Sequence, residues 1–440
     1  MQGRTTSRLD YALRCPSAEA PEGVEFDLEI APVMEGDGLD NLDLDVEAVS
    51  DFPHSKYTAK EIAKAGKALA GDLETLGAEV PQHILKAFQV ANNWRNAHAY
   101  PMRSIHASLR YYVKANDLDA ITAARLKRMQ AIRAKLRRIG VKFHRLQDLG
   151  GCRVIVATTA ETRLLVEVLK SKLPSVVQKE DDYISKPKND GYRSHHLIFG
   201  FRRSQPTPFD DKRIEVQIRT HLQHAWATTV EAVGLLRGEG LKNQKGDKDW
   251  LRFFALMSAE FAEAEKCPTV PGTPDSRSRK AEIRTLAAAL DIVKTLDAVA
   301  IGFRGTDLLL APGYKPTHYL IRFDHSTKTV RVESYNKPQK ATVSYDKAEE
   351  ILRSGDQNDV VVLVEADKIN NLKRAYPNYF GDVEVFQRQL KHIVGGGAAL
   401  EYTRPPKERT KRVSAARGDL SWLRGTRFPG PRDKKKKRKR

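Results

Sequence analysis

The sequence predicts an α+β fold: a mixed β-sheet flanked by helices, with a helical N-terminal part and a second small α/β domain. Three observations predict it. From Lys56 onward, apolar residues return every three or four positions, which is the period of an amphipathic helix. The segment RIEVQIRT (213–220) alternates apolar and polar residues, as a half-buried strand does. Between 148 and 266, apolar β-rich runs alternate with helical segments.

The expected elements follow in chain order from these periods. Two or three helices fill 56–113 before any strand. The strands then expected are 148–159, 196–203, 213–220, 318–323, 328–335 and 360–366. The helices expected beside them are 121–140, 161–173, 221–236, 249–266, 280–300, a helix near 347–352 and 368–376.

Composition divides the 440 residues into five segments. The first is strongly acidic, with twelve acids and three arginines in residues 1–50, and the last is strongly basic, with sixteen bases and three acids in 404–440. Three prolines among small polar residues mark a linker near the middle. The segments are a disordered acidic extension (1–54), the main domain with its N-terminal helices (55–266), the linker (267–279), a C-terminal helix with a small α/β domain (280–394) and a disordered basic tail (395–440).

Charge and cysteine content narrow the class of protein. The net charge is +19, and without the two ends the remaining chain still carries about +15, so we expect polyanionic partners. Cys15, Cys152 and Cys267 are too far apart to indicate a disulfide framework or a zinc site. No apolar run approaches the length of a membrane span, and no leader is recognised, so we expect a cytoplasmic protein without membrane contact.

A basic segment precedes the first expected strand. ITAARLKRMQAIRAKLRRIG (121–140) predicts a helix with a cationic face, which on its own is most often a solvated surface. Asp148 follows at the start of a strand, where a carboxylate beside bases suits Mg²⁺ and phosphate, although a turn or capping role stays open. The apolar stripe is Leu126, Met129, Ile132, Leu136 and Ile139, and the other face carries Arg125, Lys127, Arg128, Arg133, Lys135, Arg137 and Arg138.

The polar face of strand 213–220 supplies a second carboxylate, Glu215, in line with Gln217 and Arg219. A half-exposed strand has a polar face in any case. Together with Asp148 and the basic segment, however, it provides metal ligands, neutralising charge and a base, which phosphoryl-group transfer requires. The chain has neither a Walker A sequence nor GxGxxG, so a P-loop or Rossmann site is not expected.

The loop DYISKPKNDGYRSHH (182–196) is basic, aromatic and turned. Tyr192 follows Gly191 and precedes Arg193, so it can stack on a nucleobase while the bases around it reach phosphates. A tyrosine packed under the turn is the competing interpretation. The histidines nearby have no metal-binding spacing and are assigned ordinary hydrogen-bonding roles; they are His195, His196, His221 and His224.

Four motifs in order resemble the RelA/SpoT-type synthetase domain over 109–262: ARLKRMQAIRAKL, LQDLGGCRVIV, DYISKPKNDGYRSHH and EVQIRTHLQHAWATTVE. The resemblance implies a nucleotidyltransferase-like sheet. It also implies Mg²⁺-dependent transfer of the β,γ-pyrophosphoryl group of ATP to the ribose 3′-hydroxyl of GDP or GTP, the guanosine tetraphosphate synthesis of the stringent response.

By position, the resemblance assigns a role to each candidate residue. Asp148 and Glu215 resemble the catalytic and metal-binding carboxylates, with Glu215 activating the 3′-hydroxyl. ATP-binding bases are implied at Arg125, Lys127, Lys135 and Arg153. Acceptor-binding residues are implied at Lys188, Tyr192, Gln217, Arg219 and His224.

Some features depart from the long bifunctional members. None of the twelve histidines precedes an aspartate, so no hydrolase domain is expected. QHAWATTVE is closer to small and toxin-like members, and this keeps a tRNA 3′ end or an adenine nucleotide open as acceptor. A catalytically inactive nucleic-acid-binding protein is the third interpretation. Position alone predicts that residues 280–394 regulate, in which case deleting 280–440 raises activity; RNA contact through the basic surface and tail, and a homo-oligomer, are compatible with the sequence.

Overall fold

The computed structural model describes residues 52–71, 81–237, 239–241, 244, 246–302, 316–324, 329–352, 360–365 and 383–402. The expected helix 368–376, nearly all of the acidic extension, and the basic tail beyond Tyr402 lie outside these residues. Within them, the helices are all too short or too polar to cross a bilayer.

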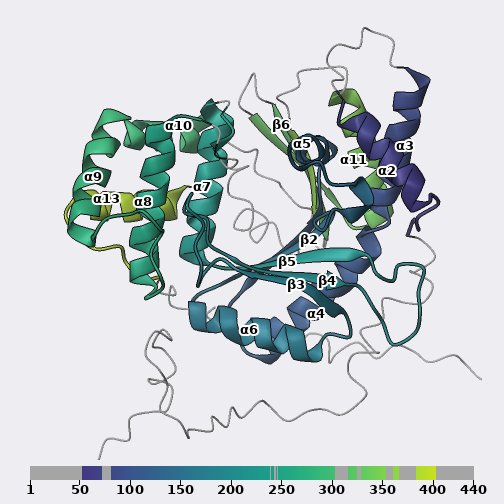
Figure 1. Ribbon diagram of the computed structural model, residues 1–440, viewed down its shortest axis with the longest axis horizontal. Coiled ribbons are helices and arrows are strands. Elements are labelled where there is room, and N and C mark those ends of the chain that lie inside the picture. The colour runs from purple at the N-terminus through teal and green to yellow at the C-terminus, as the bar shows by residue number, and fades with distance from the viewer. Residues whose placement is uncertain are drawn as a thin grey trace, which may run out of the picture. The chain divides into compact units, whose positions relative to one another are not determined.

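A single eight-stranded mixed sheet forms the centre, in the order β3-β4-β5-β2-β1-β8-β6-β7 (Figure 1). Strands β2 and β5 run parallel, and the other neighbours run antiparallel. The predicted mixed sheet is therefore confirmed. The strands are β1 (Ile121–Leu126), β2 (Gly150–Val156), β3 (Val176–Asp182), β4 (His195–Gly200), β5 (Arg213–Thr220), β6 (His318–Asp324), β7 (Thr329–Tyr335) and β8 (Val360–Glu365).

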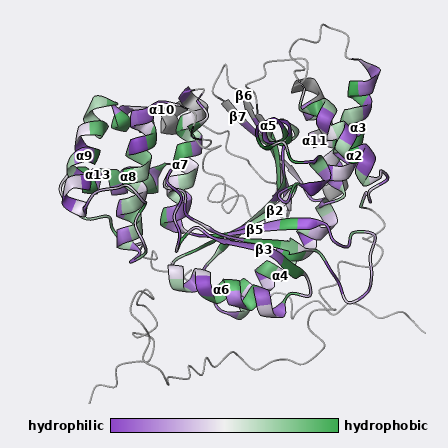
Figure 2. Cartoon of the chain, in the orientation of Figure 1, coloured by the Kyte–Doolittle hydropathy of each residue, from purple (hydrophilic) through white to green (hydrophobic). Residues whose placement is uncertain are grey.

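Helices cover both faces of the sheet. One face is closed by α4 and α6, whose apolar side chains pack on residues of β2, β4 and β5. On the other side, α7, α8, α9, α10 and α13 pack around a cluster of large aromatic residues, and Figure 2 shows the mixed hydropathy of these helices. The helices are α2 (Ala59–Leu69), α3 (Gln82–Asn96), α4 (Ala99–Ala115), α5 (Met129–Ile139), the 3₁₀ turn η2 (Phe143–Arg145), α6 (Thr159–Lys172), α7 (His221–Arg237), α8 (Lys248–Ala264), α9 (Ser276–Ala289), α10 (Ile292–Gly302), α11 (Pro338–Leu352) and α13 (Glu384–Val394).

The predicted helix over 121–140 is wrong in its first half. Residues 121–126 form β1, which pairs along its whole length with β2, and α5 begins only at Met129. Long-range pairing with an apolar neighbouring strand outweighs the helical period of this short segment. Leu126 and Arg125 therefore belong to the sheet, whereas Ile132 and Leu136 point into a small core with α2 and α3.

The C-terminal part departs from the expected layout at two points. The helix expected over 280–300 is broken between α9 and α10, where Asp291 adopts a positive φ of 48°. Strands β6, β7 and β8 do not form a sheet of their own; β8 pairs with β1 through Ala124 and Glu365. The predicted domain boundaries stay predictions. Residues 395–402, at the start of the predicted tail, lie against α7 and α13, where Tyr402 stacks on His221 with ring centroids 3.9 Å apart.

Candidate functional site

Strand register gathers several of the predicted site residues on one face of the sheet. Glu215 on β5 lies opposite Gly151 of β2, and Gln217 lies opposite Arg153. On β1, Arg125 pairs with the same Gly151. Side chains of paired residues point to the same face, so the side without α4 and α6 carries this polar set.

Asp148 lies just before β2 and is held by two lysines. Its Oδ2 accepts hydrogen bonds from Lys127 Nζ at 2.8 Å and from Lys135 Nζ at 2.7 Å. Burial opposes its ionisation, but the two lysine charges keep the pKa of Asp148 below its usual value. Its other oxygen, Oδ1, is buried without a hydrogen-bond partner. Asp148 is thus a charged carboxylate with one oxygen still able to accept.

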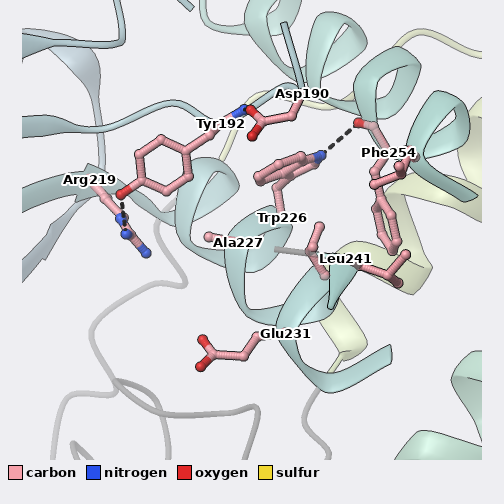
Figure 3. Close-up of a pocket in the computed structure, with 10 residues that line it drawn as sticks. Asp190, Tyr192, Arg219, Trp226, Ala227, Glu231, Leu241 and Phe254 are labelled. Carbon is pink, nitrogen blue, oxygen red and sulfur yellow. Dashed lines mark hydrogen bonds between the residues drawn. The ribbon is translucent and has the colours of Figure 1, made fainter. Parts of the chain in front are cut away.

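Five side chains close a ring of hydrogen bonds beside this carboxylate. Glu215 accepts from Gln217 Nε2 at 2.8 Å, and Gln217 accepts from Arg219 at 2.9 Å. Arg219 also donates to the Tyr192 hydroxyl at 2.5 Å, as Figure 3 shows, and that hydroxyl lies 2.7 Å from His196 Nε2. His196 Nδ1, 3.0 Å from Glu215, completes the ring.

Neighbouring charges shift the pKa values of three members of the ring. Burial would raise the pKa of Tyr192, but the charges of Arg219 and His196 lower it to about 7. Burial lowers the pKa of His196, yet Tyr192 and Glu215 raise it above its usual value. Burial would also raise the pKa of Glu215, and the contact with His196 holds it well below the usual range. The ring therefore keeps Glu215 ionised and lowers the pKa of the Tyr192 hydroxyl towards neutrality.

The loop before β4 is fixed by tight packing on α7 and α8. Gly191 has φ of +92°, and its carbonyl oxygen accepts a hydrogen bond from the Ser258 hydroxyl at 2.5 Å. A Cβ there would lie 2.9 Å from both Ser258 and Trp226 side-chain atoms, so only glycine fits. Two residues on, buried Arg193 pairs with Glu265 at 2.8 Å. These contacts hold the loop in the position from which Tyr192 takes part in the ring.

A pocket opens beside Tyr192 (Figure 3), between the loop and α7 and α8. Aromatic side chains of Tyr192, Trp226 and Phe254 line it, with carboxylates of Asp190 and Glu231 at its sides. Lys188 lies outside this set, with its Nζ 4.2 Å from the Tyr183 ring centroid and 5.1 Å from that of Tyr192. An aromatic wall of this kind suits stacking on a planar base, and Arg219 is the cation that lines it.

The donor set suits a hard divalent cation held partly by substrate. Among the described residues, no group of three or more histidine, cysteine or acidic side chains is placed to bind a metal alone. Asp148 and Glu215 are nonetheless close enough to interact: the Glu215 charge opposes the lowering of the Asp148 pKa by the two lysines. Mg²⁺ typically binds one or two carboxylates and completes its shell with water and phosphate oxygens. The unpaired Oδ1 of Asp148 fits that pattern.

Two predicted residues lie away from the ring. Arg125 lines a separate pocket of about 210 Å³ with Met102, Leu363 and Glu365. His224 is buried near the start of α7, and its carbonyl accepts from Thr228. His196, in contrast, is part of the ring although the sequence indicated only an ordinary role. Its proximity to Glu215 depends on the pairing of β4 with β5, which no local pattern reveals.

Comparison with known proteins gives one consistent family. The family model described as "Region found in RelA / SpoT proteins" matches residues 124–234. Two curated relatives come from Bacillus subtilis strain 168. GTP pyrophosphokinase YjbM is 27% identical over 130 residues, covering 29% of this chain and 61% of the relative. GTP pyrophosphokinase YwaC is 32% identical over 113 residues, covering 24% and 54%.

The chain thus spans between half and two thirds of the length of these relatives. A similar solved structure is small alarmone synthetase 1 from Bacillus subtilis bound to its product pppGpp, with a TM-score of 0.32 and 19% identity, covering 48% of this chain and all of that one. The matched region contains Asp148, Tyr192 and Glu215. Residues 124–234 are therefore a RelA/SpoT synthetase domain.

Proposed function

We propose that this chain is an ATP-dependent pyrophosphokinase that transfers the β,γ-pyrophosphoryl group of ATP to the ribose 3′-hydroxyl of GDP or GTP. The observation that carries the proposal is the pair of carboxylates, Asp148 between two lysines and Glu215 within the hydrogen-bonded ring. The family of residues 124–234 and the names of its relatives as GTP pyrophosphokinases support the same reaction.

On the donor side, Lys127 and Lys135 neutralise the triphosphate of ATP. Both ammonium groups already converge on Asp148, so phosphate oxygens entering here meet fixed positive charge. Arg153 of β2, which lies opposite Gln217, extends this basic surface. Asp148 and Glu215 would hold Mg²⁺, which supplies charge neutralisation for the transferred group.

On the acceptor side, Tyr192 stacks on the base and Glu215 withdraws the proton of the 3′-hydroxyl. Glu215 is ionised at neutral pH, and His196 Nδ1, 3.0 Å away, orients the carboxylate. Gln217 and Arg219 position Glu215 and Tyr192 through the ring, and Lys188 reaches the acceptor phosphates. A guanine base presents two adjacent N–H donors, which the carboxylates beside the aromatic pocket can accept.

One product assay tests the proposal. Purified protein is incubated with labelled ATP, Mg²⁺ and a mixture of GDP, GTP, AMP and bulk tRNA, and the products are separated by thin-layer chromatography and mass spectrometry. We expect label on guanosine nucleotides with a 3′-pyrophosphate. The absence of any 3′-pyrophosphorylated guanine nucleotide would contradict it.

A tRNA 3′ end is the second candidate acceptor, and the charge of the chain favours it. Sixteen bases against three acids in 404–440 provide phosphate contacts that a free nucleotide does not need. In the same assay, label that stays on RNA after nuclease-free purification selects this acceptor, and label found only on small nucleotides rejects it.

A further inference from the structure

Helix α5 begins next to the lysines of the proposed ATP site. Lys127 precedes the helix by two residues and Lys135 lies within it, and both bind Asp148. The helix does not cap itself: Arg128 occupies the N-cap position without a side-chain hydrogen bond, and the first turn contains no acidic residue. Unsatisfied backbone N–H groups at a helix start need an acceptor.

A residue 220 positions later in the sequence provides one such acceptor. Glu349 on α11 accepts a hydrogen bond from the Met129 backbone N–H at 3.0 Å, through its Oε1. Its Oε2 accepts from Arg95 on α3 at 2.8 Å, and the Tyr345 hydroxyl donates to Oε1. The Arg95 guanidinium also lies over the Tyr345 ring, 4.8 Å from its centroid. One carboxylate thus joins α3, α5 and α11.

The ion pair between Arg95 and Glu349 is buried. The side chain of Arg95 is 0% exposed and that of Glu349 is 8% exposed. Burial would raise the pKa of Glu349, but Arg95 keeps it below its usual value, so the carboxylate is charged. A negative charge at a helix start also interacts favourably with the helix dipole. The contact is therefore buried and ionic, and it lies at the first residue of α5.

We infer that Glu349 is a positioning residue for the donor site: it caps α5 from the C-terminal segment and so fixes Lys127 and Lys135 around Asp148. The assignment of these lysines to ATP rests on the proposed function, whereas the capping does not. On this inference the segment that contains α11 is a structural part of the donor site.

Two variants separate capping from the buried ion pair. Both carry Arg95→Leu and Tyr345→Phe, so neither leaves a buried charge or hydroxyl that depends on residue 349. The first adds Glu349→Gln, whose amide oxygen can still accept from Met129. The second adds Glu349→Leu, which fills similar space without an acceptor. They differ in the cap and in the buried amide N–H groups of the glutamine, whose lack of a partner destabilises the first variant and so works against the expected difference.

Amide hydrogen exchange and binding of the ATP analogue AMPCPP are then measured on both. We expect the leucine variant to exchange the Met129 amide and the other amides of the first turn of α5 about fivefold faster than the glutamine variant, as loss of an N-cap predicts. AMPCPP affinity and the KM for ATP should weaken by a similar factor, while the KM for the acceptor stays unchanged.

Equal exchange at Met129 in the two variants would overturn the inference. Changed exchange with unchanged AMPCPP affinity would also overturn it, because the cap would then not reach the lysines. A wild-type chain that does not bind AMPCPP refutes the proposed function instead, and the exchange measurement still decides whether Glu349 caps α5.

Discussion

At the scale of single residues, the two carboxylates differ in how they are held. Asp148 faces two lysines and keeps one oxygen unpaired, while both oxygens of Glu215 lie within the ring. This difference leaves one oxygen of Asp148 for a metal ion, whereas the hydrogen-bond partners of Glu215 keep that carboxylate ionised. The sequence predicted both residues, because each stands at a strand position beside basic side chains.

Neutralising either carboxylate should nearly abolish transfer. We expect Asp148→Asn and Glu215→Gln each to lower kcat by roughly a hundredfold or more, as for removal of an acid–base group. Steady-state product formation measures this, with circular dichroism to check folding. Near-normal rates in both variants would contradict the site assignment.

The phenol of Tyr192 should titrate near neutral pH. Its pKa is lowered to about 7 in the folded protein, so the folded state releases this proton more readily than the unfolded state does. The stabilisation it contributes is present in alkaline solution and is lost as the pH falls through about 7. Near-ultraviolet tyrosinate absorbance should show this step in the wild type and lack it in Tyr192→Phe. An identical titration in the variant would refute the assignment.

At the scale of elements, the loop that carries Tyr192 depends on one glycine. Gly191→Ala should destabilise the fold by about 1–3 kcal/mol, because a Cβ meets Ser258 and Trp226 at a positive φ. Gly140→Ala is the matched control: its φ is also positive, at +60°, but its Cβ would meet nothing within 4 Å. Urea unfolding measures both. If the free energy of unfolding of the Gly191 variant is no lower than that of the Gly140 variant, a Cβ at residue 191 does not clash with Ser258 and Trp226.

Local patterns predicted some elements and missed others for a physical reason. Strand β5 and helix α7 were expected from their own periods, and the structure confirms them. β1 was missed because its strand conformation is imposed by β2, whose sequence lies beyond α5. The same cause hid His196, which reaches Glu215 only after β4 pairs with β5, and Glu349, which reaches Met129 across 220 residues.

At the scale of the whole molecule, the C-terminal segment shares its core with the rest of the chain. Phe386 of α13 packs on Phe253, Phe254 and Phe261 of α8, with ring centroids between 5.7 and 6.2 Å apart. Residues of β6 and β8 belong to the same apolar cluster. These contacts make the segment part of one core with the helices before it, and the regulatory role that its position predicted stays a prediction.

Removing residues 280–440 should therefore inactivate the protein. The deletion exposes the aromatic cluster and removes Glu349, so we expect loss of thermal stability and of activity together. A chain ending at Tyr402 is the control and should keep both. Increased activity of the shorter fragment would instead support the regulatory prediction.

The chain that ends at Tyr402 also tests whether the basic tail contributes to RNA binding. Without the sixteen bases of 404–440, affinity for bulk RNA should fall, and the salt dependence of binding should become shallower. Filter binding at several salt concentrations measures this. Unchanged RNA binding would show that the body of the chain, and not the tail, provides the phosphate contacts.

The cap on α5 also has a consequence for synthesis on the ribosome. Met129 leaves the exit tunnel long before Glu349, since 220 residues separate them, and translation proceeds at about 5–20 residues per second. For many seconds, a nascent chain thus contains every residue of the hydrogen-bonded ring but not the group that fixes the donor lysines. A polypeptide that stops before Glu349 would then bind ATP more weakly than the longer chain, because its donor lysines lack the cap on α5.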